Sequence, residues 1–214
     1  MKTLEYIRSK FNLKGLVPGT EIHGINRTIM AQTLHELGFT VGVEVGVAEG
    51  NHAKVLLDSN PDLVLTGVDC YVKYPGYEEY GDPAKCYKEA KTKLEDYKFE
   101  FIKDYSANAS LLVNDDELDF VYIDGGHDFL NVAQDIAIWS CKVRPGGIVF
   151  GHDYKFRARR QGKRHPVHVK PVVDAFMQSH GISNWFVLTN DTKDPTFGHD
   201  NPGWLYIRSE ADEL

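Results

Sequence analysis

The sequence predicts an α/β fold built on a mainly parallel sheet of seven strands, with an antiparallel last strand and helices on both faces. Three observations predict it. Apolar runs of strand character alternate with stretches of helical spacing, the first run ends in closely spaced glycines, and the last two runs lie too close together for a crossover helix to fit between them. Strands that alternate with helices connect by right-handed crossovers, which makes their sheet parallel. The length of 214 residues suits one such domain.

The expected elements follow one another in a regular order. Residues 1–16 and 25–37 have helical patterns and precede the first strand, where they pack on the sheet edge or form a substrate lid. Strand-like runs follow at 41–47, 63–69, 99–104, 119–124, 146–153, 184–191 and 203–209. Helical patterns lie between them at 51–59, 84–97, 106–113, 128–143 and 171–180. A Pro/Gly-rich loop separates the last two runs, so we expect those strands to pair antiparallel.

The composition argues against several classes of protein. No apolar run approaches the ~18 residues that a membrane span requires. The net charge of −7 repels a nucleic-acid backbone, so nucleic acid is not the expected partner. The three cysteines match neither a disulfide framework nor a zinc site and indicate reduced thiols. We therefore expect a cytoplasmic protein without a membrane partner, and a homodimer is one alternative for its oligomeric state.

The turn after the first strand is the first candidate ligand site, because ligands of open α/β sheets bind beyond the carboxyl ends of the strands. The strand ends in VEVGVAEG, which contains Glu44, Gly46, Val47 and Gly50. Glycine allows a ligand to approach the backbone closely. The spacing differs from the dinucleotide fingerprint, and Glu44 stands where a pyrophosphate would meet a negative charge. A ligand with positive groups and no phosphate fits better, which favours S-adenosylmethionine.

The end of the second strand provides a further cofactor residue, Asp69, which Cys70 follows. The carboxylate of Asp69 can accept hydrogen bonds from both hydroxyls of a ribose. That feature alone fits NAD equally well, and only its combination with the glycine turn favours S-adenosylmethionine. An NAD(P)-dependent oxidoreductase and a non-catalytic S-adenosylmethionine-binding module therefore stay as alternatives.

Five strand ends together resemble the class I S-adenosylmethionine-dependent methyltransferases, over residues 38 to 209. They are VEVGVAEG, GVDCY, FIKDYSANA, DFVYIDGGH and RPGGIVFGHDY, in the order of that family. The resemblance implies a Rossmann-like methyltransferase domain over residues 38–214, preceded by an N-terminal helical segment at 1–37. It also implies that Asp104, Tyr105 and Ser106 lie near the adenine. With these three, we expect the cofactor to contact Glu44, Gly46, Val47, Gly50, Asp69, Cys70 and Asp124.

Polar side chains follow the fourth and fifth strands. IDGGHDF contains Asp124 and His127, and GHDY contains His152 and Asp153. Methyl transfer needs alignment of the reactants and a group that takes the proton of the nucleophile. His127 is the preferred base because imidazole titrates near neutral pH, and Asp124 and Asp153 complete the catalytic set. Asp128 is expected only to cap the helix that follows it.

The same cluster has a metal interpretation. The sequence is similar here to the small-molecule O-methyltransferase branch that includes catechol and macrolide-sugar enzymes, where carboxylates after strands four and five hold a divalent ion. Asp124 and Asp153 match those positions, and His152 departs from them. An imidazole there shifts the preference from magnesium toward manganese, iron or zinc, or indicates that no metal binds. The resemblance implies O-methylation of a small molecule, with or without manganese or magnesium.

Two segments near the site are candidates for binding the acceptor. The long connection after the second strand holds several tyrosines, and we single out Tyr74 and Tyr77, which suit a sugar ring or an aromatic acceptor. Residues 155–170 are rich in Lys and Arg and contain no acid. Three arginines there suit a phosphate or a carboxylate of the acceptor: Arg157, Arg159 and Arg160. A solvated or packed surface loop is the alternative for both segments, and together they favour an acidic or glycosylated small molecule.

Overall fold

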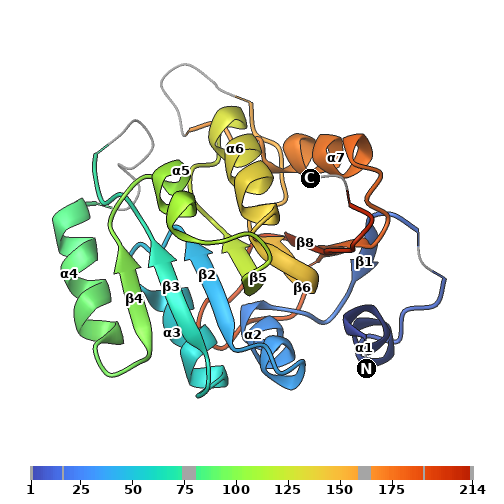
Figure 1. The fold of residues 1–214 in the computed structure, drawn as a ribbon, viewed down its shortest axis with the longest axis horizontal. Coiled ribbons are helices and arrows are strands. Elements are labelled where there is room, and N and C mark those ends of the chain that lie inside the picture. The colour runs from blue at the N-terminus through green and yellow to red at the C-terminus, as the bar shows by residue number, and fades with distance from the viewer. Residues whose placement is uncertain (1, 16, 74–80, 159–164, 190, 213–214) are drawn as a thin grey trace.

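The computed structural model describes residues 2–15, 17–73, 81–158, 165–189 and 191–212 (Figure 1). Its centre is an eight-stranded sheet in the order β1-β7-β8-β6-β5-β2-β3-β4. The strands are β1 (Thr20–Ile22), β2 (Val41–Val45), β3 (Val64–Val68), β4 (Phe99–Ile102), β5 (Leu118–Ile123), β6 (Val143–Gly151), β7 (Trp185–Leu188) and β8 (Gly203–Ile207). All seven strand-like runs of the sequence form strands, and the α/β class is confirmed.

The predicted number of seven strands is wrong by one. The additional strand, β1, lies between the two N-terminal helices and pairs in parallel with β7 at the edge of the sheet. Three residues are too short to produce a recognisable alternation of apolar and polar side chains. This strand forms because β7 presents an unpaired edge, which is a tertiary effect.

The strand directions place most ligand-facing loops at one edge of the sheet. β8 runs antiparallel to both of its neighbours, β6 and β7, and all other pairs are parallel. The predicted antiparallel last strand is therefore confirmed. Because β7 consequently runs in the same direction as β6, the loop from β7 to β8 leaves the sheet at the same edge as the loops that follow β2, β3, β5 and β6.

Helices cover both faces of the sheet (Figure 1). One face carries α1 (Thr3–Lys10), α2 (Arg27–Glu36), α3 (Asn51–Ser59) and α4 (Pro83–Leu94). The other face carries α5 (Ser106–Ala109), which continues into a short 3-10 turn, α6 (Phe129–Ser140) and α7 (Val169–Ser179). Each set packs its buried apolar side chains into its own core cluster, so the sheet is buried on both sides.

Side-chain caps fix where the helices beside the ligand edge begin. The carboxylate of Asp128 accepts hydrogen bonds from the backbone N–H groups of Leu130 and Asn131, which confirms its predicted role as the cap of α6. Asn26 caps α2 in the same way, through the N–H of Ile29. Within the described ranges, no helix combines the length and the apolar character that crossing a membrane would require.

Candidate functional site

Two adjoining cavities of about 400 Å³ each open at the ligand edge of the sheet. The first, which we call the histidine cavity, is lined by His52, His127 and His152 among others. The second, the α5 cavity, lies between the ends of β3 and β4 and the starts of α5 and α6. Both are lined by Gly46, Asp69 and Gly125, so one elongated ligand could occupy both.

Gly46 shapes the boundary between the two cavities. Its φ of +93° lies in a region that disfavours side chains, and a Cβ atom there would overlap the backbone carbonyl of Asp124. The turn from β2 to α3 can therefore lie directly against the end of β5. Gly50 also has a positive φ, but its surroundings are Ala90 and Leu94 of α4, so the structure gives it a packing position at the start of α3.

Asp69 at the end of β3 braces this turn. One carboxylate oxygen accepts the N–H of Ala48 at 3.0 Å and the other accepts the N–H of Tyr71 at 2.9 Å. The Tyr71 hydroxyl in turn donates to the carbonyl of Ala48. Burial raises the pKa of Asp69, and these backbone donors act against that effect. The carboxylate has a further lone pair for a ligand hydroxyl at the shared boundary of the cavities.

Glu44 is almost fully buried beneath the histidine cavity. Its Oε1 lies 3.1 Å from Nδ1 of His52, on α3, and its Oε2 has no hydrogen-bond partner among the described residues. Burial raises the pKa of the Glu44 carboxyl well above its usual range and lowers the pKa of His52. A buried oxygen without a partner is costly, and a ligand cation in the cavity would relieve that cost.

The α5 cavity contains the three residues that the resemblance placed near an adenine, Asp104, Tyr105 and Ser106, and also Cys70. Asp104 accepts hydrogen bonds from the N–H of Tyr105 and from the side chain of Asn108. Ser106 accepts a hydrogen bond from the indole of Trp139.

Asp135 of α6 also lines the α5 cavity, and the sequence did not indicate it. Burial raises the pKa of Asp135 to about 6, and a hydrogen bond with Ser106 acts in the opposite direction.

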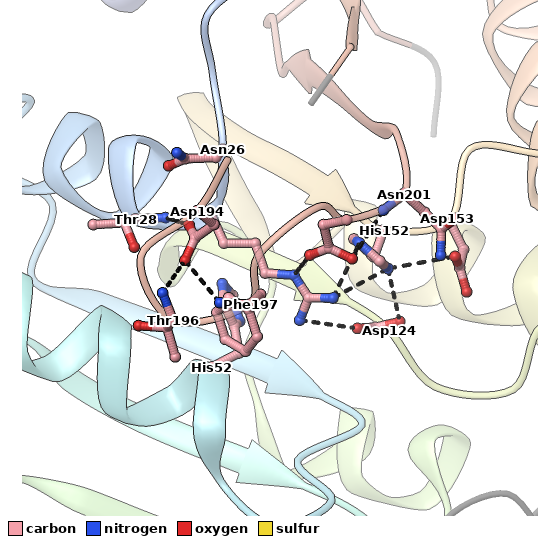
Figure 2. A network of polar contacts seen from close by, with 12 residues as sticks. Asn26, Thr28, His52, Asp124, His152, Asp153, Asp194, Thr196, Phe197 and Asn201 are labelled. Atoms are coloured by element: carbon pink, nitrogen blue, oxygen red, sulfur yellow. Dashed lines mark hydrogen bonds and ion pairs between the residues drawn. The ribbon is translucent and has the colours of Figure 1, made fainter. Parts of the chain in front are cut away.

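The histidine cavity brings together the four polar residues that follow β5 and β6. Figure 2 shows three of them: Asp124, His152 and Asp153. Nε2 of His127 lies 3.2 Å from Oδ1 of Asp124 and 3.2 Å from Oδ2 of Asp153. Nδ1 of His152 lies 3.9 Å from Oδ1 of Asp124 and 3.5 Å from Oδ1 of Asp153. The sequence predicted this convergence, because both strands end at the same edge.

The charges in the cluster shift one another's proton affinities. Burial alone would raise the pKa of Asp124, but His152, the hydrogen bond with His127, and Arg27 hold it well below its usual range. Burial alone would lower the pKa of His127, but Asp124 and Asp153 raise it. Asp153 itself has a φ of +55°, which is uncommon for a residue with a side chain.

The charged residues of this cavity that the sequence analysis did not single out include Arg27 and Asp200. Arg27 at the start of α2 places its Nε 2.6 Å from Oδ2 of Asp200, which lies on the loop from β7 to β8. The guanidinium carbon of Arg27 lies 4.4 Å from the ring centre of Phe197, on the same loop. One signal was available: a reversed last strand sends the preceding loop to the ligand edge, and that loop contains several acids.

The predicted acceptor residues are only partly described. Arg157 lines the histidine cavity, and its Nε donates to the carbonyl of His165 at 3.0 Å. Lys155, two residues earlier, reaches Oδ1 of Asp153 at 2.8 Å. Four of the predicted residues lie outside the described ranges: Tyr74, Tyr77, Arg159 and Arg160.

The donor atoms of the cluster fit a divalent metal ion. One ligand atom each from Asp124, His152 and Asp153 lies within 4.8 Å of the others. Ligands that bond to one ion at about 2.0–2.2 Å lie about 3–4 Å from one another, and two of the three separations in the cluster are in this range. Two carboxylates and one imidazole suit manganese, iron or zinc better than magnesium.

Comparisons with known proteins identify the type of domain. A family model described as "Methyltransferase domain" matches residues 43–154, which include the glycine turn and the ends of β3, β5 and β6. No curated protein sequence matches the chain.

Solved structures share the fold at low sequence identity. The O-methyltransferase TomG from Streptomyces achromogenes, involved in tomaymycin synthesis and solved with S-adenosylmethionine, is 14% identical, with a TM-score of 0.61 over 98% of this chain and 91% of that one. An O-methyltransferase from Bacillus cereus in complex with S-adenosylhomocysteine is 13% identical, with a TM-score of 0.59 over 96% and 90%.

An N-methyltransferase has a similar fold as well. The 1,6-didemethyltoxoflavin enzyme from Burkholderia thailandensis is 14% identical, with a TM-score of 0.53 over 86% of this chain and 79% of that one. Likeness at this level establishes the fold, and the family model covers the strand ends that form the two cavities. The oxidoreductase alternative is therefore not favoured. The chain belongs to the methyltransferase-domain family, as a class I S-adenosylmethionine-dependent methyltransferase.

Proposed function

We propose that this enzyme methylates an oxygen of a small acidic acceptor with the help of a divalent metal ion held by Asp124, His152 and Asp153. One observation carries the proposal. The cluster of carboxylates and imidazoles at the ends of β5 and β6 lines the same cavity as the glycine turn after β2. The proton-transfer groups and the candidate metal ligands are thus next to the expected methyl donor.

We infer that the cofactor spans both cavities in one orientation. The adenine lies in the α5 cavity beside Asp104, Tyr105 and Ser106, and the ribose lies at Asp69, where the cavities meet. The ammonium of the methionyl part lies toward Glu44, whose Oε2 lacks a partner. When bound, S-adenosylmethionine supplies a methyl group on a sulfonium. The acceptor oxygen attacks the methyl carbon in line, and S-adenosylhomocysteine is the leaving group.

The residues of the chain then prepare the acceptor. His127 lies between Asp124 and Asp153 and takes the proton of the acceptor hydroxyl, because both carboxylates stabilise its protonated form. A bound divalent ion would lower the pKa of that hydroxyl and orient it. Lys155 and Arg157, which also line the histidine cavity, favour an acceptor with a carboxylate or a phosphate.

The test combines cofactor binding with product analysis. We expect micromolar binding of S-adenosylmethionine and S-adenosylhomocysteine by calorimetry and no binding of NAD. Acidic phenols and sugar acids, incubated with the donor and with manganese or magnesium, should yield an O-methylated product identified by mass spectrometry and NMR. A methyl group found only on nitrogen, over a panel that also offers amines, would contradict the proposed acceptor atom.

A variant tests the role of His127. His127→Ala should lower turnover by roughly 10²–10⁴-fold while S-adenosylhomocysteine binds as in the wild type. A comparable loss of cofactor affinity would show that His127 supports the cofactor site instead. His168→Ala is the matched control. The described contacts of the His168 side chain are the backbone N–H of Phe129 and the ring of Phe156, and His168 is not part of the described lining of the histidine cavity.

A further inference from the structure

The loop from β7 to β8 brings a carboxylate to the far side of His152. Oδ1 of Asp200 lies 2.9 Å from Nε2 of His152, and both side chains are buried. The opposite ring nitrogen, Nδ1, faces Asp124 and Asp153. Asp200 is thus not one of the three candidate metal ligands, but it contacts one of them, His152, directly.

This contact favours Nε2 as the ring nitrogen of His152 that carries the proton. A carboxylate can only accept a hydrogen bond, so Nε2 is the protonated nitrogen when it faces Asp200. In a neutral imidazole the other nitrogen, Nδ1, then has a lone pair. That lone pair lies 3.5 Å and 3.9 Å from oxygens of the two carboxylates, an arrangement that is favourable only with a cation between them.

Arg27 holds Asp200 in this position. Its Nε pairs with Oδ2 of Asp200, which leaves Oδ1 directed at His152. A terminal nitrogen of Arg27 lies 3.0 Å from Nε2 and 3.4 Å from Nδ1 of His152. A guanidinium can only donate hydrogen bonds, so the Arg27 nitrogen at 3.0 Å competes with Asp200 for Nε2, and the two residues favour opposite tautomers of His152. Asp200 and Arg27 together fix the orientation of the imidazole ring.

We propose that Asp200 is a positioning residue of the metal centre, which fixes His152 as the Nε2–H tautomer and presents Nδ1 to the ion. This inference rests on the metal-assisted form of the proposed function. Metal-bound histidines generally donate their second N–H to a carboxylate or a carbonyl, and loss of such a partner weakens metal binding by 10-fold to 100-fold.

Manganese binding to the cofactor-free protein tests the proposal without an activity assay. Free Mn²⁺ is measured by electron paramagnetic resonance while the wild type and three variants are titrated. Asp200→Asn should weaken binding by about 10-fold to 100-fold. Asp153→Asn, which removes a ligand charge and tolerates the positive φ, should abolish it. Asp191→Asn is the matched control on the same loop, because Asp191 contacts His23 and Gly24 instead of the cluster, and it should bind as the wild type does.

The outcomes separate this proposal from the proposed function. Wild-type affinity in Asp200→Asn, together with lost binding in Asp153→Asn, would overturn the role of Asp200 and leave the metal site intact. No manganese binding by the wild type would overturn both the metal site and the role of Asp200, while methyl transfer is judged separately by product formation.

Nitrogen-15 NMR of histidine-labelled wild-type protein gives a second test that needs no stable variant at position 200. His152, assigned with His152→Gln, should show a protonated Nε2 and a metal-bound Nδ1 in the protein loaded with diamagnetic zinc. The opposite tautomer would overturn the proposal. In Asp200→Asn, if folded, the preference for Nε2–H should be lost or reduced.

Discussion

Gly46 shows how closely a single residue is specified by its surroundings at the donor site. Its positive φ and the carbonyl of Asp124 each disfavour a side chain at this position. The sequence indicated the glycine from its place after a strand, but it could not indicate which backbone group lies opposite. The contact with the end of β5 is a consequence of strand order.

Gly46→Ala should therefore destabilise the protein and abolish cofactor binding. We expect the free energy of unfolding to fall by roughly 3 kcal/mol, because the new methyl group overlaps backbone that cannot move easily. Urea unfolding and calorimetry with S-adenosylhomocysteine measure the two effects.

Gly38→Ala is the control for backbone strain. Gly38 also has a positive φ, but a Cβ there meets no atom within 4 Å. The strain of a left-handed residue alone costs about 1–2 kcal/mol. Equal losses of stability in the two variants would show that the φ angle, not the close approach of Asp124, matters at Gly46.

The raised pKa of Asp135 predicts that the free energy of unfolding depends on pH. Burial raises its pKa from 3.8 to about 6, so the folded protein favours the protonated carboxyl. The contribution of this carboxyl to the free energy of unfolding is greatest below pH 3.8, where it is protonated in both the folded and the unfolded protein. That contribution decreases as the pH rises from 3.8 through about 6. At neutral pH the charged carboxylate then costs up to about 3 kcal/mol. Asp135→Asn should remove this cost.

Urea unfolding of the wild type and of Asp135→Asn from pH 4 to pH 7.5 measures this effect. The variant should gain stability relative to the wild type as the pH rises, because only the wild type acquires a buried charge. A difference that stays constant over this range would show that the Asp135 carboxyl does not titrate there. Asp62→Asn, which removes an exposed acid away from α6, controls for general effects of a lost acid.

At the scale of elements, one aspartate attaches the loop from β7 to β8 to the start of α2. Asp194 is buried, and its carboxylate accepts the N–H groups of Thr28, Thr196 and Phe197 (Figure 2). This attachment positions Arg27 of α2 beside Asp200 of the loop. The two elements are far apart in the sequence and meet only because the sheet order brings β7 and β8 near the N-terminal segment.

Asp194→Ala should leave these three backbone N–H groups without their acceptor. Loss of hydrogen bonds to a buried charged group costs roughly 2–3 kcal/mol, and we expect a decrease of this size in the free energy of unfolding. Asp194→Asn retains one acceptor oxygen and should lose less. Faster hydrogen exchange at residues 191–202 in the alanine variant would show that the loop has detached. If the exchange of the loop is unchanged, other contacts hold it in place.

The part of the site that lies at the ends of parallel strands could be predicted from the sequence. Asp124, His127, His152 and Asp153 follow parallel strands, and the rule that such ends meet at one edge was enough to bring them together. Asp200, Arg27 and Asp135 carry no comparable local signal, because their positions depend on helix packing and on the reversed last strand. Strand β1 was missed for the same reason, since its pairing with β7 is decided by the assembled sheet.

At the scale of the whole molecule, the site is assembled from nearly the full length of the chain. The described lining of the two cavities runs from Arg27 near the N-terminus to Asn201 before β8. A ligand in both cavities therefore links the turns after β2, β3 and β5 with the start of α5. Strand β1 and helix α1 contribute no residue to the described lining of either cavity.

Cofactor binding should consequently protect several distant segments at once. We expect saturating S-adenosylhomocysteine to slow amide hydrogen exchange at residues 46–50, 69–71, 104–107 and 124–127, measured by mass spectrometry. Exchange in β1 and α1 should stay unchanged, because neither lines a cavity, and NAD should protect none of these segments. Protection confined to the histidine cavity, with no change at residues 104–107, would place the ligand outside the α5 cavity and refute the orientation proposed for the adenine.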